Sequence, residues 1–247
     1  MEDLDRARVV PGCADAMLRT LEAHGLEWDG AVEYQSAHTA RYVQALGNLS
    51  SAGRTFECSC TRSELADGGY PGICRDGPRK DGPTATRFRV DDGEAVFEDR
   101  AQGRCAFSLR ERGDFVLRRR DGLFAYQLAV VIDDAQAGIT DVVRGADLLD
   151  NTPWQLALQR ALSLPTPRYL HLPLVMQGPR GKLSKSRRAL ALDPRMAGSQ
   201  LHQVLTLLMQ APPLSLKLEA PRAILDWARE HWSLDRFQGS REVLLPE

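Results

Sequence analysis

The stretch Gln177-Gly-Pro-Arg-Gly-Lys-Leu-Ser-Lys-Ser186 follows an apolar run, Tyr169-Leu-His-Leu-Pro-Leu-Val175, and interrupts it with glycine and proline. Gly and Pro at this density predict a loop or a tight hairpin. Lys182 and Lys185 place two ammonium groups on this lysine loop, and lysine acts as a compact point charge toward phosphate oxygens. The loop therefore suits a polyphosphate, although an ordinary solvated basic loop has the same composition.

The lysine loop is not a P-loop, although its Gly-Lys pair is shared with that motif. A Walker A motif has Ser or Thr after its Lys, and a Gly five positions before its second Gly. Those positions hold Leu183 and Met176 in this chain. Any phosphate contact here would therefore depend mainly on the lysine side chains.

The amino-acid composition indicates the cellular compartment and the class of protein. The 247 residues, 43% apolar and 26% charged, are enough for one large or two modest globular domains. The net charge of −1 gives no global attraction to nucleic acid, so only local patches such as 118–120 could provide it. No apolar run approaches the roughly 18 residues of a membrane helix, and no signal peptide opens the chain. We expect a cytoplasmic protein with no membrane partner.

Three of the five cysteines form a cluster, Cys58-Ser-Cys60 and then Cys74. Their spacing in a reducing compartment favours a metal site over a disulfide framework. Zinc takes four ligands, and no His lies between Cys58 and Cys74. The fourth ligand would be Tyr70, a distant side chain or water. Free buried thiols are the alternative.

The N-terminal third is predicted to be helical after an acidic opening. Met1-Glu-Asp-Leu-Asp5 is either a solvated tail or a segment that follows a strand. A helical pattern then runs from Pro11-Gly12 to Gly25. Ser36 is a candidate N-cap for a second helix, whose apolar face is expected to contain Tyr42, Val43, Leu46 and Leu49.

The middle of the chain predicts an α/β pattern. Residues 115–127 read as a hairpin with a type I′ turn at Asp121-Gly122. A helix and then a buried strand follow, and the strand ends at Arg144. Ligands gather at the carboxyl ends of such strands, so Arg144 is a candidate clamp for a carboxylate or phosphate; a surface arginine is the alternative. A helix with Pro153 in its first turn and a strand over 169–175 lead to the lysine loop.

Several segments together resemble one family. Lys182-Leu-Ser-Lys-Ser186 resembles the Lys-Met-Ser-Lys-Ser signature of class I aminoacyl-tRNA synthetases. The segment from Phe124-Ala-Tyr-Gln-Leu-Ala129 to Val143-Arg-Gly-Ala-Asp-Leu-Leu149 and the opening Glu2-Asp-Leu-Asp5 resemble their glutamyl and glutaminyl branch. With the cysteine cluster, the whole chain is similar to the short paralogues of glutamyl-tRNA synthetase, the glutamyl-Q tRNA(Asp) synthetases.

This resemblance implies an α/β fold, a Rossmann-like class I catalytic domain with a zinc-bearing insertion and a short helical C-terminal region. It divides the chain into the remainder of a first Rossmann half (1–53), a zinc-bearing insertion (54–114), a second Rossmann half ending in the lysine loop (115–186) and a helical appendix (187–247). The appendix is too short for the anticodon-binding region of a full glutamyl-tRNA synthetase. We expect a monomer.

The resemblance also implies an activity. L-glutamate would be activated with ATP, without tRNA, and the glutamyl group transferred to queuosine at the wobble position of tRNA(Asp). The resemblance places Glu2 on the substrate ammonium group, with Tyr126 and Arg144 as the other glutamate contacts. It implies ATP binding by Lys182 and Lys185, with Lys185 stabilising charge on the leaving pyrophosphate, and Mg²⁺ as a companion of ATP. One structural zinc would be held by Cys58, Cys60, Tyr70 and Cys74.

The chain departs from the family pattern at its beginning. Class I enzymes carry a His-x-Gly-His signature after the first strand, and the histidines here never form it. The family also places a strand, an Arg and a Ser ahead of the segment that opens this chain, which corresponds to about forty residues of a β-α-β unit. We therefore expect residues 1–247 alone to be inactive and a version extended upstream to be active. An inactive homologue that binds zinc or tRNA, and a fragment of a glutamyl-tRNA synthetase, are the alternatives.

Overall fold

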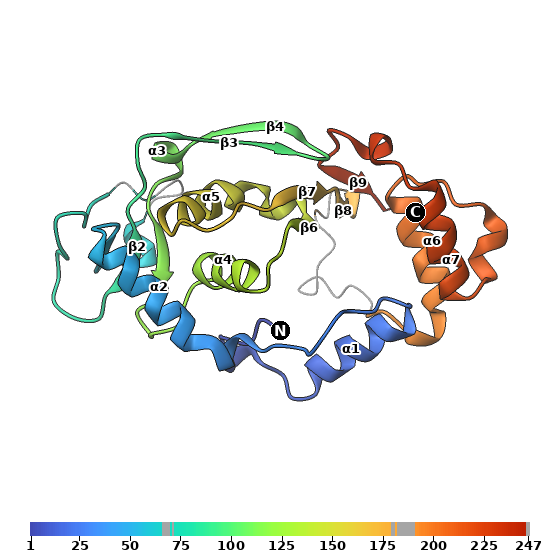
Figure 1. Ribbon diagram of the computed structural model, residues 1–247, viewed down its shortest axis with the longest axis horizontal. Helices are drawn as coiled ribbons and strands as arrows, with labels where there is room; N and C mark the ends of the chain where they lie inside the picture. Colours follow the sequence, from blue (N-terminus) through green and yellow to red (C-terminus); the bar gives the residue numbers. More distant parts are fainter. Residues whose placement is uncertain (66–69, 71, 179–180, 182–190, 246–247) are drawn as a thin grey trace.

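The computed structural model describes residues 1–65, 70, 72–178, 181 and 191–245. The strands fall into three sheets, of which the largest is a mixed sheet of four strands in the order β4-β3-β7-β6. Its strands are β3 (Glu94–Asp99), β4 (Gly103–Ser108), β6 (Asp141–Gly145) and β7 (Arg168–Leu172). β3 and β4 form an antiparallel hairpin, which lies along one edge of the molecule in Figure 1. β7 pairs in parallel with both β3 and β6.

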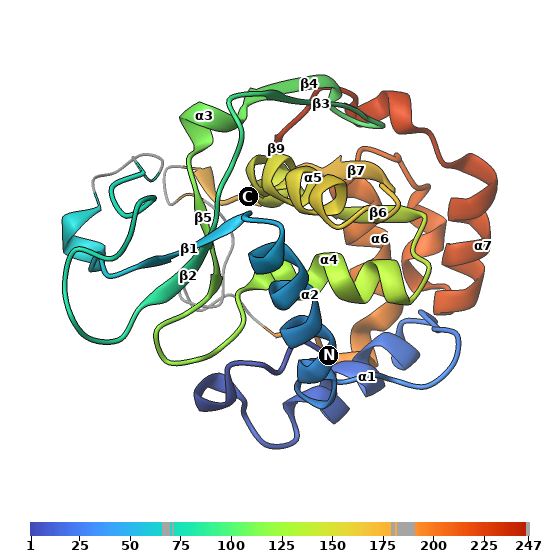
Figure 2. The ribbon, with the colours of Figure 1, turned by 60° about the vertical axis from the view of Figure 1, so that its left-hand side comes forward.

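Two helices cover this sheet and fill the main core. They are α4 (Tyr126–Gln136) and α5 (Thr152–Ala161). A parallel strand pair needs a crossover connection, and α5 supplies it between β6 and β7. The two helices lie side by side across the centre of Figures 1 and 2, and the amide of Gln155 donates to the side chain of Gln127 between them. Leu128 and Leu158 are fully buried in this core.

A smaller antiparallel sheet carries the cysteine cluster. Its strands, in the order β1-β2-β5, are β1 (Thr55–Cys58), β2 (Ala85–Phe88) and β5 (Phe115–Arg118). Figure 2 shows this sheet on the side of the molecule away from the C-terminal helices. The helix α3 (Leu109–Arg112) joins β4 to β5. The range 54–114 thus contributes strands to both sheets, and its division into a separate insertion stays a prediction.

The N-terminal segment is docked on the protein. The backbone N–H of Ser36 donates to Asp3 Oδ1 at 2.8 Å, and the Ser36 hydroxyl donates to Asp3 Oδ2 at 2.6 Å. These bonds show that the acidic opening is not simply a solvated tail. They also correct the prediction that Ser36 caps the second helix, because its hydroxyl is already used by Asp3. That helix, α2 (Thr39–Ser51), has His38 at its N-cap.

The helical prediction for the N-terminal third is otherwise confirmed. The helix α1 (Cys13–Ala23) follows Gly12, and Gly25 turns the chain after it with a φ of 70°. Tyr42 and Leu49 of α2 are buried as predicted, but Val43 is 59% exposed. The apolar face of α2 is therefore narrower than the sequence pattern suggested.

Two predictions for the middle of the chain are wrong in detail. The second strand of the expected hairpin is reduced to a single bridge between Arg118 and Phe124, because α4 already begins at Tyr126. The strand that ends near Arg144 was expected to be buried, yet it lies at the edge of the sheet and Val143 is 58% exposed. The helix-then-strand order and the position of Arg144 within that strand are confirmed.

The C-terminal region consists of two packed helices and a strand. The helices α6 (Ala197–Leu207) and α7 (Pro221–His231) lie at one end of Figure 1 and bury Leu201, Leu205 and Ile224 between them. The strand β9 (Glu242–Leu244) pairs in parallel with β8 (Leu174–Met176), an arrangement that the sequence did not predict. Pro173 separates β8 from β7, so the predicted strand over 169–175 is divided between two sheets.

Short 3-10 helices connect the other elements, and none of the described helices is long and apolar enough to cross a membrane. The 3-10 helices are η1 (Arg6–Arg8), η2 (Gln35–His38), η3 (Arg62–Glu64), η4 (Ala146–Asn151), η7 (Pro194–Met196), η8 (Leu214–Leu218) and η9 (Leu234–Phe237). Glu64 accepts from the backbone N–H and the hydroxyl of Thr61 at the start of η3, which is half of a capping box.

Candidate functional site

Arg144 is held at the carboxyl end of β6 by the neighbouring strand and helix. The register of the parallel pair places Arg144 opposite His171. Its Nε–H donates to His171 Nε2 at 3.0 Å, and its Nη2 donates to the Thr152 hydroxyl at 2.8 Å, at the start of α5. The guanidinium carbon also lies 5.3 Å from the centre of the Tyr169 ring. Arg144 is therefore part of a built polar site.

Tyr126, at the first position of α4, faces this arginine. Burial raises the pKa of the Tyr126 hydroxyl, and the nearby carboxylate of Glu2 raises it further. The positive charge of Arg144, and a hydrogen bond between Arg144 and Tyr126, lower this pKa. The Arg144 guanidinium and the Glu2 carboxylate therefore both lie close enough to Tyr126 to change the pKa of its hydroxyl. Glu2, Tyr126 and Arg144, predicted from different parts of the sequence, converge on one place.

A fourth group, Asp134, belongs to the same place. Burial raises the pKa of Asp134 to about 6; the charge of Arg144 opposes the rise, and the carboxylates of Asp133 and Glu2 add to it. The neighbouring Asp133 has a different task, because it accepts hydrogen bonds from the Tyr42 hydroxyl and the Gln35 amide. One of the two adjacent carboxylates is therefore structural, and the other faces the glutamate candidates.

Asp134 makes stability depend on pH. Because its folded pKa of about 6 lies above its ordinary value of 3.8, the folded state loses stability as the pH rises from 3.8 through 6. We expect Asp134→Asn to raise the free energy of unfolding by about 1–3 kcal/mol at pH 7.5, and by almost nothing at pH 4. Urea unfolding at both pH values measures this, with Asp29→Asn, at an exposed position, as the control. An equal effect at both pH values would contradict the assignment.

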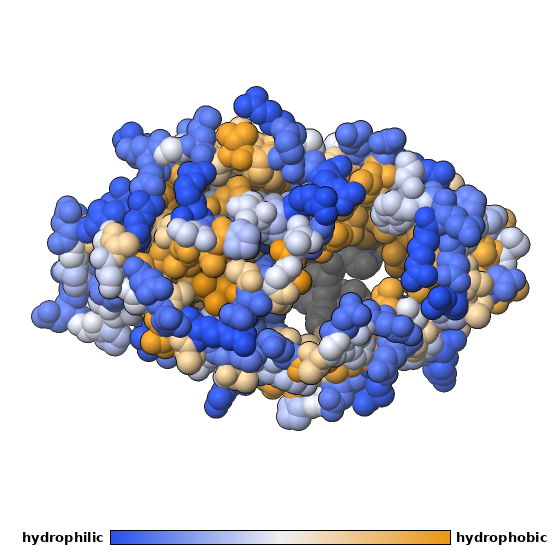
Figure 3. Space-filling view, in the orientation of Figure 1, coloured by the Kyte–Doolittle hydropathy of each residue, from blue (hydrophilic) through white to orange (hydrophobic). Residues whose placement is uncertain are grey.

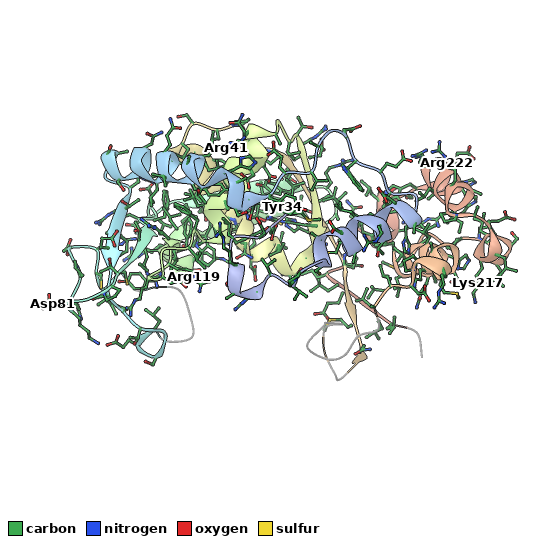
Figure 4. The ribbon with its side chains drawn as sticks, turned by 90° about the horizontal axis from the view of Figure 1, so that it is seen from below. Tyr34, Arg41, Asp81, Arg119, Lys217 and Arg222 are labelled. Carbon is green, nitrogen blue, oxygen red and sulfur yellow. The ribbon has the colours of Figure 1, made fainter. Side chains whose placement is uncertain are left out.

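A cavity of about 830 Å³ opens beside these groups. Glu2 and Tyr126 line it, together with Tyr34 and Arg119. Figure 4 labels the last two: Tyr34 comes from the segment before α2, and Arg119 from the turn after β5. Figure 3 shows the face of the molecule seen in Figure 1, where apolar side chains are exposed between polar ones over the central layer. Glu2 and Tyr126 thus border both the cavity and the polar site, whereas Arg144 and Asp134 are not among the residues that line the cavity.

The cysteine cluster forms a second candidate site. The Sγ atoms of Cys58, Cys60 and Cys74 all lie within 4.8 Å of one another. The Tyr70 hydroxyl lies 3.5 Å from the Cys58 Sγ and 3.9 Å from the Cys60 Sγ. A tetrahedral zinc with bonds of about 2.3 Å to sulfur keeps its ligand atoms about 3.8 Å apart. The three thiols and the phenol are therefore placed as a zinc site requires.

The surroundings of the cluster also suit a metal. Burial raises the pKa of the Cys74 thiol, but hydrogen bonds from Tyr70 and from the backbone of Ser59 and Arg79 outweigh it and lower the pKa to about 6. The guanidinium of Arg87, itself buried, lies 4.0 Å from the centre of the Tyr70 ring. Burial and hydrogen bonds with the other two thiols instead raise the pKa of Cys60 to about 11, so of these two cysteines only Cys74 is set to ionise readily to the thiolate, the form that binds zinc. The other two cysteines are outside the cluster: Cys105 is buried and Cys13 exposed.

The structure thus brings together most of the predicted site residues. Glu2, Tyr126 and Arg144 meet at one site, and the four zinc candidates meet at another. Lys182 and Lys185 lie outside the described residues. Sequence reasoning missed the contributions of Asp134 and of the buried His171. The alternation of side chains along 169–172 was the available signal for His171, since it puts that ring on the same face as Tyr169.

Comparison with known proteins identifies the family of the chain. The model of the family described as tRNA synthetases class I (E and Q), catalytic domain, matches residues 1–68 and 73–201. The glutamyl-Q tRNA(Asp) synthetase of Ectopseudomonas mendocina (strain ymp) is 51% identical over 246 residues, covering 98% of this chain and 84% of the relative. That of Dechloromonas aromatica (strain RCB) is 49% identical over 258 residues, covering 100% of this chain and 86% of the relative.

Solved structures support the fold. The glutamate-tRNA synthetase of Elizabethkingia anophelis has a TM-score of 0.77 at 20% identity, covering 99% of this chain and 60% of that one. A glutamate tRNA ligase of Elizabethkingia meningosepticum, solved in complex with its amino acid, has a TM-score of 0.76 at 19% identity, covering 100% and 59%. The chain therefore spans about 60% of the length of these solved proteins. By its family match and its close relatives, the chain belongs to the glutamyl-Q tRNA(Asp) synthetases, within the class I tRNA synthetases for glutamate and glutamine.

Proposed function

We propose that this protein activates L-glutamate with ATP, without tRNA, and transfers the glutamyl group to queuosine at the wobble position of tRNA(Asp). In the first step an oxygen of the substrate α-carboxylate attacks the α-phosphorus of ATP, and pyrophosphate leaves. The resulting glutamyl adenylate then loses AMP to a nucleophile on queuosine. The names of the close relatives support this reaction, and the convergence of Glu2, Tyr126 and Arg144 carries it.

Each of these three residues has a role that its chemistry suits. The Glu2 carboxylate would bind the α-ammonium group, and the Arg144 guanidinium would bind the side-chain carboxylate of the substrate. Tyr126, between the two charges, would fix the carbon chain. Glutamine in place of glutamate would leave the guanidinium without its anion, which is a strong basis for selection in a partly buried site.

Two further groups complete the proposal. Lys185, with Lys182, would stabilise the negative charge that develops on the leaving pyrophosphate, and Mg²⁺ would accompany ATP. Zinc on Cys58, Cys60, Tyr70 and Cys74 would have a structural task, since all four protein ligand positions are filled and no position remains for a reacting water. The segment that contains these four ligands, residues 58–74, would then be held in one conformation.

Exchange of radioactive pyrophosphate into ATP tests the first step. We expect exchange that depends on L-glutamate, does not need tRNA and is at least about 1,000-fold weaker with L-glutamine. Lys185→Ala should lower the exchange rate about 100-fold or more while leaving the Kd for glutamate unchanged. The 247-residue chain and a version extended upstream are compared, and the variant is made in whichever of them shows exchange. Equal exchange with glutamine would contradict the proposed role of Arg144.

A further inference from the structure

Two fully buried side chains, Asp99 and His171, form a chain that ends on Arg144. Both side chains have no solvent exposure. His171 Nδ1 lies 2.6 Å from Asp99 Oδ2, and the other ring nitrogen, Nε2, lies 3.0 Å from Arg144 Nε. The strand register produces this order, because Asp99 at the end of β3 and Arg144 on β6 flank the two sides of β7. No part of the proposed reaction uses the imidazole itself.

Asp99 is placed to remain ionised. Its Oδ1 accepts hydrogen bonds from the backbone N–H groups of Ala101, Gln102 and His171. Burial raises the pKa of Asp99, but these bonds and the one from the His171 ring outweigh it, so the pKa lies below its ordinary value. An ionised carboxylate can only accept, so the proton of the imidazole must be on Nδ1.

Arg144 fixes the other side of the ring. A guanidinium can only donate, and its Nε–H is directed at His171 Nε2. That nitrogen must therefore carry a lone pair, so the imidazole is neutral and in its Nδ1–H tautomer. An imidazolium, or the opposite tautomer, would place two N–H groups against each other. The same guanidinium donates through Nη2 to Thr152.

We propose that Asp99 and His171 are positioning residues for substrate selection, which hold the Arg144 guanidinium in one orientation through a fixed histidine tautomer. This inference rests on the proposed function, in which Arg144 binds the side-chain carboxylate of glutamate. His171 engages Nε, and Thr152 and the Leu148 carbonyl engage Nη2, which leaves Nη1 outside these three contacts. The Nη1 edge is therefore the one that remains for a substrate.

The orientation matters because arginine is long and has several rotamers. A guanidinium that turned about its side-chain axis would keep its charge but lose the paired geometry that distinguishes a carboxylate from an amide. A misplacement of about 1 Å can cost about 100-fold in a positioned site. By holding the Arg144 guanidinium in one orientation, Asp99 and His171 allow it to distinguish the carboxylate of glutamate from the amide of glutamine.

NMR measures the tautomer directly. Long-range ¹H–¹⁵N spectra of the histidine rings distinguish the Nδ1–H tautomer, the Nε2–H tautomer and the imidazolium, and a His171→Gln variant identifies the signals of this ring among those of the five histidines. We expect the neutral Nδ1–H tautomer at pH 7.5. An Nε2–H tautomer or an imidazolium would overturn the proposal.

Asp99→Asn tests the consequence for binding. The asparagine oxygen stays with the three backbone N–H groups, so its NH₂ faces the ring and forces the Nε2–H tautomer, which repels the Arg144 Nε–H. We expect the Kd for L-glutamate to rise about 10- to 100-fold, with the Kd for ATP unchanged. In an Arg144→Lys background the same substitution should have almost no further effect, because residues that act through one another are not additive.

A matched control separates positioning from general loss of stability. Asp114 is also fully buried and accepts from Arg75 and the backbone of Val90, but it makes no contact with Arg144 among the described residues. Asp114→Asn should lower the melting temperature and leave the Kd for glutamate within about twofold. Equal effects of the two variants on that Kd would overturn the proposal. A wild-type chain with the expected tautomer that binds no glutamate would instead contradict the proposed function.

Discussion

Replacing Arg144 by glutamine is expected to raise the Kd for L-glutamate about 30- to 5,000-fold. Removing one partner of a hydrogen-bonded charge pair in a desolvated site costs about 2–5 kcal/mol, and each 1.4 kcal/mol is a factor of ten. The guanidinium is held by His171 and Thr152, so a shorter neutral side chain cannot reach the same position. Isothermal titration calorimetry with L-glutamate and L-glutamine measures the change.

The selectivity is the more informative part of this experiment. Because glutamine lacks the carboxylate that Arg144 would bind, its weak binding should change little in the variant, and the preference for glutamate should largely disappear. Arg168→Gln is the control, since Arg168 is an exposed arginine that pairs with Asp141 at the start of β7. A variant that keeps the preference for glutamate would show that Arg144 is only a structural residue of the strand.

Loss of one zinc ligand is expected to have the second large effect. We expect the purified protein to contain about one zinc per chain, and Cys74→Ser to lose it. The free energy of unfolding should fall by about 3 kcal/mol or more, which lowers the melting temperature by roughly 6–12 °C, because structural metals contribute directly to folding. Elemental analysis and thermal unfolding, with and without a chelator, measure both quantities.

Cys13→Ser is the control for the zinc experiment, because Cys13 is exposed and lies outside the cluster. It should keep the zinc and change the melting temperature by less than about 2 °C. Tyr70→Phe tests the fourth ligand separately: the phenol oxygen is lost, while the ring keeps its place near Arg87. A protein without zinc that keeps its stability in the Cys74 variant would favour free buried thiols.

Single residues show which parts of this site could be predicted from the sequence and which could not. The order of α4, β6, α5 and β7 could be predicted, since apolar periodicity and Pro153 fix their type, and Arg144 was expected in the strand where it is found. Ser36 could not be placed correctly, because its hydroxyl binds Asp3, far away in the sequence. Local capping preferences cannot anticipate such a competing partner.

The same limit explains the missed support of Arg144. Asp99 and His171 are 72 positions apart in the sequence, and only the parallel register of β3, β7 and β6 brings them together. The residues next to a histidine in an apolar strand do not indicate whether its ring is only a buried part of the core or also positions a functional residue. The pKa of Asp134, about 6, likewise depends on burial and on charges from three elements. Electrostatic interactions between residues far apart in the sequence are thus the feature of this site that could not be predicted from the sequence.

Mass spectrometry of tRNA(Asp) tests the central claim most directly. The tRNA, with and without queuosine, is incubated with ATP and L-glutamate and either the 247-residue chain or its upstream-extended version, then digested to nucleosides. The proposed function predicts that the mass of one glutamyl group is added to queuosine, and that nothing is added to tRNA(Asp) that lacks it. Unchanged queuosine with both chains, or glutamate attached at the 3′ end of the tRNA, would contradict the proposal.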